Sequence, residues 1–272
     1  MTLWVNGVVV DPAAPVVRAD DHGVTVGDGV FETMKVTGGQ PFALTRHLRR
    51  LESSAAGLGL PVDLDLIRDG VAAVVAAQPL GSARLRVTVT AGPAPYGSDR
   101  GDSPVTVIVA TAPLAEWPPT ADVVTVPWTR NERAATAGLK TTSYADNVVA
   151  LDYAHQRGGA EAIFANTRGE LCEGTGSNVF LGIDGQLVTP PLSSGCLAGI
   201  TRELLVEWLG DVAERAVPLE ALAAADEAFL TSSTRDVQPI RAVDGRVLAA
   251  APGPLTARAR EVFAQRSTEP DP

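Results

Sequence analysis

The segment Gly138-Leu139-Lys140-Thr141-Thr142-Ser143 decides the fold predicted for this 272-residue chain, because it places a lysine just before a helical stretch. Only two of the 22 basic residues are lysines, Lys35 and Lys140, and the others are arginines. An arginine stays protonated in a protein, whereas the amine of a lysine can become a nucleophile. Lys35 and Lys140 are therefore both candidates for amine chemistry, and chance is the alternative explanation.

Two later segments supply groups that complement such an amine. Glu173 lies within 171–178, where a predicted strand runs into a loop of small residues. Gly199-Ile200-Thr201 opens a predicted helix, whose free backbone amides and dipole can hold a phosphate. A Schiff-base lysine, a carboxylate for a pyridinium nitrogen and a phosphate cradle are what pyridoxal 5'-phosphate requires. Each segment alone also fits a surface lysine, a strand end or an ordinary helix cap, but their combination favours this cofactor.

The composition excludes several other classes of protein. The formal net charge is -10, and no basic stripe is present to neutralise phosphates, so nucleic-acid and anionic-membrane partners are not expected. The three histidines are far apart in sequence, so no metal site is expected. No apolar run reaches the roughly 18 residues of a membrane span. Cys172 and Cys196 are interpreted as free thiols, and we expect a cytoplasmic enzyme.

Other catalytic motifs have weaker support. A Ser-His-Asp triad stays open, although no Gly-x-Ser-x-Gly elbow supports it. The glycine cluster at 27–29 lacks the Gly-x-Gly-x-x-Gly pattern of a dinucleotide site and is typical of a tight turn into a strand.

Hydrophobic periodicity and turn signals predict a mixed order of helices and strands. Ser143 with Asp146 three residues later is a capping-box pattern at the start of one helix. The expected strands are 3–5, 8–10, 84–90, 105–111, 122–127, 161–165, 178–183 and 227–231, and the expected helices are 44–56, 63–77, 143–156 and 199–209.

A proline-rich stretch at 112–119 indicates a division into two domains. We expect a small N-terminal α/β domain over 1–115, an interdomain linker at 116–120, and a larger C-terminal α/β domain over 121–272 that binds the cofactor. The fold class expected is therefore α/β (α+β) with two domains.

The order of motifs resembles the class IV aminotransferases, the fold-type IV family of pyridoxal-phosphate enzymes. The resemblance extends from Gly27-Asp28-Gly29-Val30-Phe31-Glu32-Thr33 to Thr231-Ser232-Ser233-Thr234. It implies a two-domain fold, a homodimer and a small amine or amino acid as substrate. A protein of this fold that holds the cofactor without turnover is an alternative, and the presence of Lys140 argues against it.

Individual roles follow from the same resemblance. Lys140 looks like the Schiff-base lysine that also moves the substrate proton, Glu173 like the partner of the pyridine nitrogen, and Arg50 like the phosphate-binding arginine. The further cofactor contacts implied are Thr175, Ser177, Asn178, Ile200, Thr201, Ser233 and Thr234. The substrate contacts implied are Phe31, Arg84, Arg86, Tyr96 and Tyr144.

The reaction favoured at this point is that of 4-amino-4-deoxychorismate lyase, which eliminates pyruvate and leaves 4-aminobenzoate for folate synthesis. Thr33 is similar to a threonine that lyase relatives use beside the lysine, so it is a second catalytic candidate. Arg84 and Arg86 share one face of a predicted strand and would suit a substrate with two carboxylates, unless that face is solvated.

The alternative reaction is transamination of D-amino acids, branched-chain amino acids or (R)-amines. D-alanine-type aminotransferases hold the substrate carboxylate with an Arg-x-His pair, where this chain reads Pro95-Tyr96-Gly97-Ser98. Branched-chain enzymes place a tyrosine five residues after the lysine, where this chain has Ala145, and Tyr144 is one position early.

Overall fold

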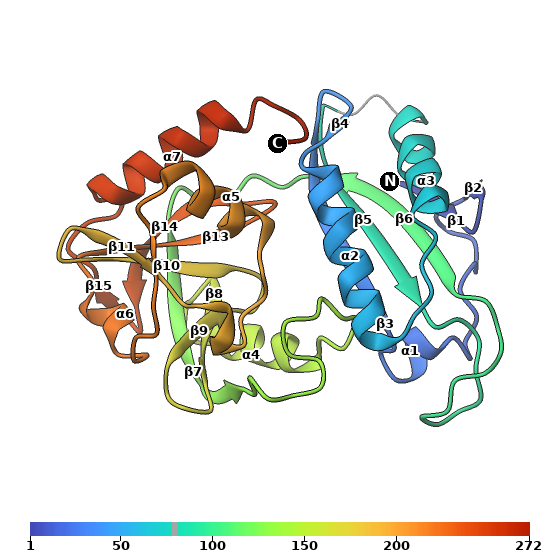
Figure 1. Cartoon of the computed structure of the whole chain (residues 1–272), viewed down its shortest axis with the longest axis horizontal. Helices are drawn as coiled ribbons and strands as arrows, with labels where there is room; N and C mark the ends of the chain where they lie inside the picture. Colours follow the sequence, from blue (N-terminus) through green and yellow to red (C-terminus); the bar gives the residue numbers. More distant parts are fainter. Residues whose placement is uncertain (78–80) are drawn as a thin grey trace. The chain divides into compact units, whose positions relative to one another are not determined.

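The computed structural model describes residues 1–77 and 81–272, which form two compact units (Figure 1). Unit 1 comprises Met1–Ala115, Leu139–Tyr144 and Glu269–Pro272, and unit 2 comprises Glu116–Gly138 and Ala145–Thr268. Both units combine helices with a sheet, which confirms the expected α/β class. Among the described residues, every helix is too short or too polar to cross a membrane.

Unit 1 is built on a six-stranded antiparallel sheet with the order β2-β1-β6-β5-β3-β4. Its strands are β1 (Thr2–Val5), β2 (Val8–Val10), β3 (Gly29–Thr37), β4 (Gln40–Pro41), β5 (Ser82–Thr90) and β6 (Thr106–Pro113). Its helices are α1 (His22–Thr25), α2 (Leu44–Leu58) and α3 (Leu64–Ala76).

Helices α2 and α3 cover one face of this sheet (Figure 1). Because successive side chains of a strand point to opposite faces, Leu85, Val87 and Val89 of β5 are buried with the helices. The alternating residues of β5, including Arg84 and Arg86, lie on the opposite face of the sheet. Alternation along one strand therefore separates an apolar core from a polar face.

Unit 2 is built on a nine-stranded mixed sheet with the order β12-β11-β10-β13-β14-β7-β8-β9, in which β15 pairs with β14. Its strands are β7 (Ala121–Arg130), β8 (Glu161–Asn166), β9 (Leu171–Gly174), β10 (Asn178–Ile183), β11 (Gln186–Thr189), β12 (Ala213–Glu214), β13 (Glu227–Ser232), β14 (Asp236–Val243) and β15 (Arg246–Val247). Its helices are α4 (Ala145–His155), the 3-10 turn η1 (Leu192–Ser194), α5 (Ile200–Leu209), α6 (Ala221–Ala224) and α7 (Pro254–Arg266).

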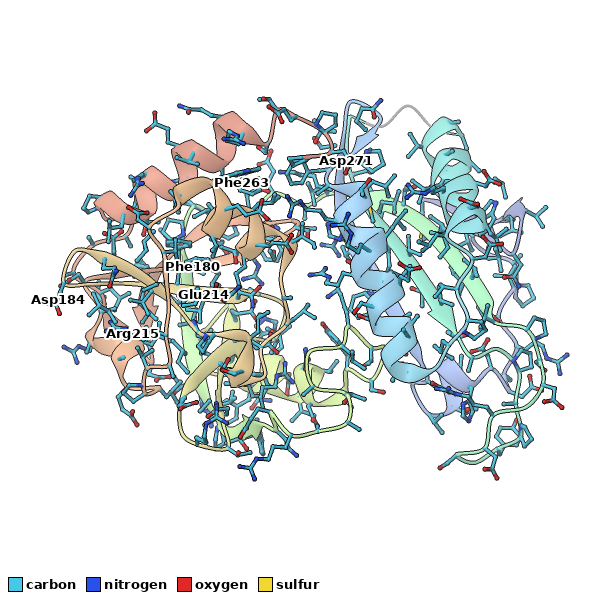
Figure 2. All side chains as sticks on the ribbon, viewed as in Figure 1. Phe180, Asp184, Glu214, Arg215, Phe263 and Asp271 are labelled. Carbon is cyan, nitrogen blue, oxygen red and sulfur yellow. The ribbon has the colours of Figure 1, made fainter. Side chains whose placement is uncertain are left out.

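Strands β8, β10 and β13 of unit 2 are buried almost completely. Strand β7 pairs in parallel with β14 and β8, and helix α4 packs against β7 and β8. Phe180 of β10 stacks on Phe229 of β13 with ring centroids 4.8 Å apart, and Figure 2 shows Phe180 within this unit. Both rings are fully buried, so this pair lies at the centre of the packing.

The division into units differs from the predicted domains at residues 139–144. Backbone hydrogen bonds attach this segment to β3, from Phe31 N–H to the carbonyl oxygen of Lys140 and from Thr142 N–H to that of Gly29. The lysine segment therefore belongs to unit 1, whereas the domain limits predicted from the sequence place it in the C-terminal domain.

Two other segments also differ from the predicted domain limits. The predicted linker is part of unit 2, where the carbonyl oxygen of Pro118 accepts a hydrogen bond from Gln238. The C-terminal residues belong to unit 1, because the Asp271 carboxylate accepts hydrogen bonds from Thr45 at the first turn of α2 (Figure 2).

Two predicted helix ends are wrong. The Ser143 hydroxyl donates to the carbonyl oxygen of Gly27 instead of capping a helix, so α4 begins at Ala145. Helix α2 continues through Gly57 and ends before Gly59, which has φ +69°. A glycine in this left-handed conformation ends a helix without steric cost, whereas Gly57 keeps helical geometry.

Helix α3 contacts the sheet closely at Gly70. A Cβ atom at this position would lie 2.8–3.0 Å from three atoms of the buried Trp4 ring. Alanine is favoured over glycine in a helix by about 1 kcal/mol, but overpacking a core costs about 1–3 kcal/mol. We predict that Gly70→Ala lowers the free energy of unfolding measured by urea denaturation, despite the better helix propensity.

The combined variant Gly70→Ala/Trp4→Leu tests the steric cause. Leucine lacks the indole ring, so the loss in the combined variant should be smaller than the sum of the two single losses. Additive losses would show that Gly70→Ala acts through something other than the Trp4 contact.

Candidate active site

The backbone of Lys140 is held against both β3 and α2 of unit 1. Thr141 forms a bridge with Val30, and the Lys140 N–H donates to the Ser54 hydroxyl at 3.1 Å. A Cβ atom on Gly57 would meet the Leu139 side chain at 2.7 Å, so a residue without a side chain permits this close approach. The segment before α4 is thereby fixed as an extra edge on β3.

The amine of Lys140 lies in an aromatic corner. Its Nζ atom is 4.2 Å from the centre of the Phe31 ring and 3.5 Å from the Tyr144 hydroxyl oxygen. The two rings meet edge to face, with centroids 5.1 Å apart. The structure therefore brings Lys140, Phe31 and Tyr144 together. Tyr144 follows Lys140 by four residues instead of the five found in branched-chain enzymes, and its hydroxyl still contacts the lysine amine.

Arg86 lies on the face of β5 that points away from the core, beside the Phe31 ring. Its guanidinium carbon is 3.8 Å from the centre of the Phe31 ring, and its Nε donates to the Thr88 hydroxyl at 3.2 Å. Partial loss of solvent lowers the pKa of Arg86 from its ordinary value. Thr33 is the direct cross-strand partner of Arg86, and Arg84 pairs with Lys35 one step further along the same face.

Sequence reasoning missed a buried charge cluster beside the lysine. The fully buried Glu32 carboxylate accepts two hydrogen bonds of 2.7 Å from Arg50 and one of 2.6 Å from Nδ1 of His47. Burial alone would raise the pKa of Glu32, but the charges and hydrogen bonds of Arg50 and His47 bring it far below its usual range. Burial lowers the pKa of His47, and the charge of Lys140 adds to that direction.

One signal in the sequence marks this cluster. His47 and Arg50 are three positions apart on the predicted helix and therefore share one face of it, which α2 turns toward β3. Arg50, the predicted phosphate ligand, thus has its guanidinium oriented by Glu32.

Unit 2 contains the other predicted cofactor residues. The Glu173 carboxylate accepts the Leu197 N–H at 2.9 Å and lies 3.2 Å from Nε of Arg130. Arg130 in turn stacks over the Phe164 ring at 4.0 Å. A hydrogen bond on one oxygen and an ion pair on the other fix the orientation of this carboxylate.

The start of α5 lies next to the start of β10. Gly199 precedes the helix without a capping side chain, and a Cβ atom on it would collide with the amide oxygen of Asn178. Asn178 donates to the carbonyl oxygen of Leu197 at 2.8 Å. The N–H groups of Ile200 and Thr201 have no acceptor within the helix, as in any first turn, and are suited to an anion.

The remaining predicted residues of unit 2 lie in two turns. The hydroxyls of Thr175 and Ser177 donate to the buried carboxylate of Glu161. Ser233 and Thr234 occupy the turn between β13 and β14. The hydroxyl of Thr231, opposite Asn178 in the sheet, is buried without a hydrogen-bond partner among the described residues.

These groups fit pyridoxal phosphate by their chemistry. An oriented carboxylate suits a protonated ring nitrogen, and an uncapped helix start suits a phosphate. The Lys140 amine of unit 1 is the kind of group that binds the cofactor aldehyde.

Tyr96 is not brought to the lysine. It lies in the loop between β5 and β6, is 79% exposed, and lines an open hollow of about 510 Å³ with Arg18, Asp20 and residues 93–95. Its predicted contact with substrate gains no support within unit 1.

The charge cluster generates a prediction about acid stability. The lowered pKa of Glu32 means that its carboxylate stabilises the fold above the unfolded pKa of about 4.3, and that this contribution is lost as the pH falls. His47, whose pKa is also lowered, loses its contribution as the pH falls below about 6.5. We predict that Glu32→Gln costs about 3–5 kcal/mol at pH 7, because it leaves the charge of Arg50 unpaired.

Urea denaturation at pH 7, 5.5 and 3.5 measures both effects. Wild-type stability should fall over the whole range, whereas Glu32→Gln should lose less than wild type between pH 5.5 and 3.5. An equal loss in both proteins would contradict the assignment of Glu32 as the acid-sensitive group.

Comparison with known proteins places the chain among relatives of similar length. The family model for amino-transferase class IV matches residues 29–243. A putative branched-chain-amino-acid aminotransferase of Methanocaldococcus jannaschii is 31% identical over 261 residues, covering 91% of this chain and 90% of the relative. A D-alanine aminotransferase of Listeria monocytogenes is 31% identical over 291 residues, covering 98% and 96%.

A solved structure agrees with these relatives. The fold IV transaminase of Curtobacterium pusillum has a TM-score of 0.87 and 31% identity, covering 97% of this chain and 99% of its own. This confirms the fold expected from the sequence, and the use of pyridoxal 5'-phosphate by the family agrees with the expected cofactor. With the match to most of the chain, these findings show that the protein belongs to the class IV aminotransferase family.

Proposed function

We propose that this protein is a pyridoxal-phosphate-dependent aminotransferase, which moves the amino group of an amino acid or amine to a 2-keto acid. The observation that carries the proposal is the position of the Lys140 amine, 4.2 Å from the Phe31 ring and 3.5 Å from the Tyr144 hydroxyl. A lysine whose backbone is hydrogen-bonded to β3 and α2 is oriented for covalent attachment and for proton transfer.

Each residue has a role in this proposal. When bound, pyridoxal phosphate supplies a ring that withdraws electrons from the amino-bearing carbon of the substrate. Lys140 would hold the cofactor and move a proton at Nζ, and the Tyr144 hydroxyl would orient that amine. Glu173 would keep a proton on the ring nitrogen. The N–H groups of Ile200 and Thr201 would hold the phosphate.

Arg50 and the turn between β13 and β14 supply the other phosphate contacts in this proposal. Glu32 occupies two nitrogens of the Arg50 guanidinium and thereby sets the direction in which the rest of it points. Ser233 and Thr234 supply hydroxyls from the turn before β14.

Amino transfer replaces the lyase as the leading reaction. The two relatives described above at 31% identity are named as aminotransferases for a branched-chain amino acid and for D-alanine. We propose these two classes of amino acid as the substrates to test first. The lyase remains the second candidate because Thr33 lies directly opposite Arg86, on the strand that also carries Phe31.

We also propose that the protein works as a homodimer in the cytoplasm. The family resemblance supports the dimer, and the composition with its two free, buried cysteines supports a reducing compartment.

An amino-donor assay tests the proposed function. L-leucine, D-alanine and an (R)-amine are each incubated with the cofactor-loaded protein and 2-oxoglutarate or pyruvate. We expect keto product from at least one donor, and none from Lys140→Ala, in which borohydride should no longer trap the cofactor on residue 140.

The same assay includes 4-amino-4-deoxychorismate without any keto acid. Release of 4-aminobenzoate and pyruvate there, with no product from the amino donors, would replace the transaminase by the lyase. A Lys140→Ala protein that still turns over would contradict both reactions as written here.

Arg86 generates a prediction about substrate binding. Its guanidinium faces away from the core, bonds only the Thr88 hydroxyl among the described residues, and is already partly desolvated beside Phe31. We propose that it binds a substrate carboxylate. A hydrogen bond to a charged group contributes about 1.5–3 kcal/mol, so Arg86→Met should raise KM for amino-acid donors by roughly 10- to 100-fold.

Arg68→Met is the matched control, because Arg68 is an exposed arginine of α3 and should leave KM unchanged. The (R)-amine, which lacks a carboxylate, should be affected much less by Arg86→Met than an amino acid is. Equal effects on both donors would show that Arg86 does not recognise the carboxylate.

A further inference from the structure

A buried carboxylate at the first residue of β8 is joined to both turns of unit 2 that carry predicted cofactor contacts. Glu161 is fully buried. The Thr175 N–H donates to its Oε1 at 2.9 Å, the Thr175 hydroxyl donates to the same oxygen, and the Ser177 hydroxyl donates to Oε2 at 3.3 Å. Two residues of the turn at 174–178 are thus fixed to one side chain.

Arg235 connects the second turn to the same carboxylate. It follows Thr234 directly, and its Nη2 lies 2.6 Å from Oε2 of Glu161. Its guanidinium is also stacked over the Trp117 ring at 4.1 Å and donates to Gln238 at 3.4 Å. With its side chain only 9% exposed, Arg235 is held on several sides.

The packing around Glu161 leaves little freedom to the first turn. A Cβ atom on Gly174 would collide with the Ser177 hydroxyl and would lie 3.2 Å from Cγ of Glu161. Gly174 follows Glu173 immediately, and Asn178 at the other end of the turn bonds Leu197, whose N–H binds Glu173. A shift of this turn would therefore move the Glu173 carboxylate and its hydrogen-bond donor together.

A gain in folding stability does not by itself explain the buried Glu161–Arg235 ion pair. Removing two charges from water costs more than their attraction often returns, so apolar residues of similar volume are frequently as stable. The pairing of β10 with β13 already holds one end of each turn in place. The Glu161–Arg235 pair adds a second, side-chain link between these turns, and no other ion pair among the described residues connects them. This favours a role in positioning.

We propose that Glu161 and Arg235 are positioning residues, which hold the turns at 174–178 and 232–236 in the arrangement that binds pyridoxal phosphate. The inference rests on the proposed cofactor roles of Glu173 and of the second turn. Neither Glu161 nor Arg235 touches the cofactor in this proposal. Both act through the turns that they join.

The test measures cofactor affinity directly rather than turnover. Apoprotein is titrated with pyridoxal 5'-phosphate, and the dissociation constant is obtained from the absorbance of the bound cofactor. Glu161→Gln removes the charge that Arg235 needs, and misplacing a supporting group typically costs about tenfold or more in affinity. We expect at least that loss, together with a shifted absorbance maximum and partial recovery in Arg235→Lys relative to Arg235→Met.

Glu227→Gln is the matched control. Glu227 is a buried carboxylate of the same unit and accepts two backbone hydrogen bonds, from Leu255 and Thr256 at the start of α7. Its replacement should lower the thermal midpoint to a similar extent but leave the dissociation constant within about twofold. An equal loss of affinity in both variants would reduce the role of Glu161 to general stability.

The double variant Glu161→Gln/Arg235→Met separates positioning from folding. It buries no unpaired charge, so its thermal midpoint should recover relative to Glu161→Gln. Its cofactor affinity should stay low, because the side-chain link between the two turns is lost and only the pairing of β10 with β13 still connects them. Recovery of affinity together with stability would overturn the proposal. Failure of the wild-type protein to bind the cofactor would instead overturn the proposed function, so the two failures are distinguishable.

Discussion

The attachment of residues 139–144 to β3 fixes where the Lys140 amine lies in unit 1. Two backbone hydrogen bonds and the bridge between Val30 and Thr141 bring a lysine from the middle of the chain to a strand near its start. Backbone groups buried at such a junction must find partners, and here they find them in each other. The aromatic corner around the amine exists because Phe31 belongs to that same strand.

Each unit contains one fully buried glutamate that is paired with an arginine, at a place where cofactor contacts were predicted. In unit 1, Glu32 orients Arg50, and in unit 2, Glu161 orients Arg235. An arginine is suited to this because its planar group can bind a carboxylate through two nitrogens and still present other donors. The buried charges are thus explained better by the placement of neighbouring groups than by stability.

The polar face of the β5–β3 pair is where substrate chemistry is best supported. The alternation of β5 puts Arg86 on the face away from α2 and α3, and the register of the sheet puts Thr33 opposite it. The Arg86 guanidinium and the Lys140 amine both make cation–π contacts with the Phe31 ring, so this ring holds the two cations near each other. The carboxylate of a small substrate would meet a complementary charge on this face.

Local structure and the chemical classes of the candidate functional groups follow from the amino-acid sequence alone. Alternation and helical spacing depend only on neighbouring residues, so the β1–β2 hairpin, β5, α3 and α5 were predicted close to their observed limits. The scarcity of lysine marks Lys35 and Lys140 as candidates, and the order of motifs indicates the family. Strand β14 was missed because Pro239 weakens its pattern, and α7 because its polar residues hide the buried face.

Which side chains meet cannot be predicted from local patterns and depends on how the whole chain packs. The Ser143 hydroxyl does not cap a helix, because it donates a hydrogen bond to the carbonyl oxygen of Gly27, more than a hundred residues away. The pairs formed by Glu32 with Arg50 and by Glu161 with Arg235 join residues on different elements, and no local pattern states which carboxylate a buried arginine will find. The physical reason is that such contacts depend on sheet register and helix packing, which the whole chain sets together.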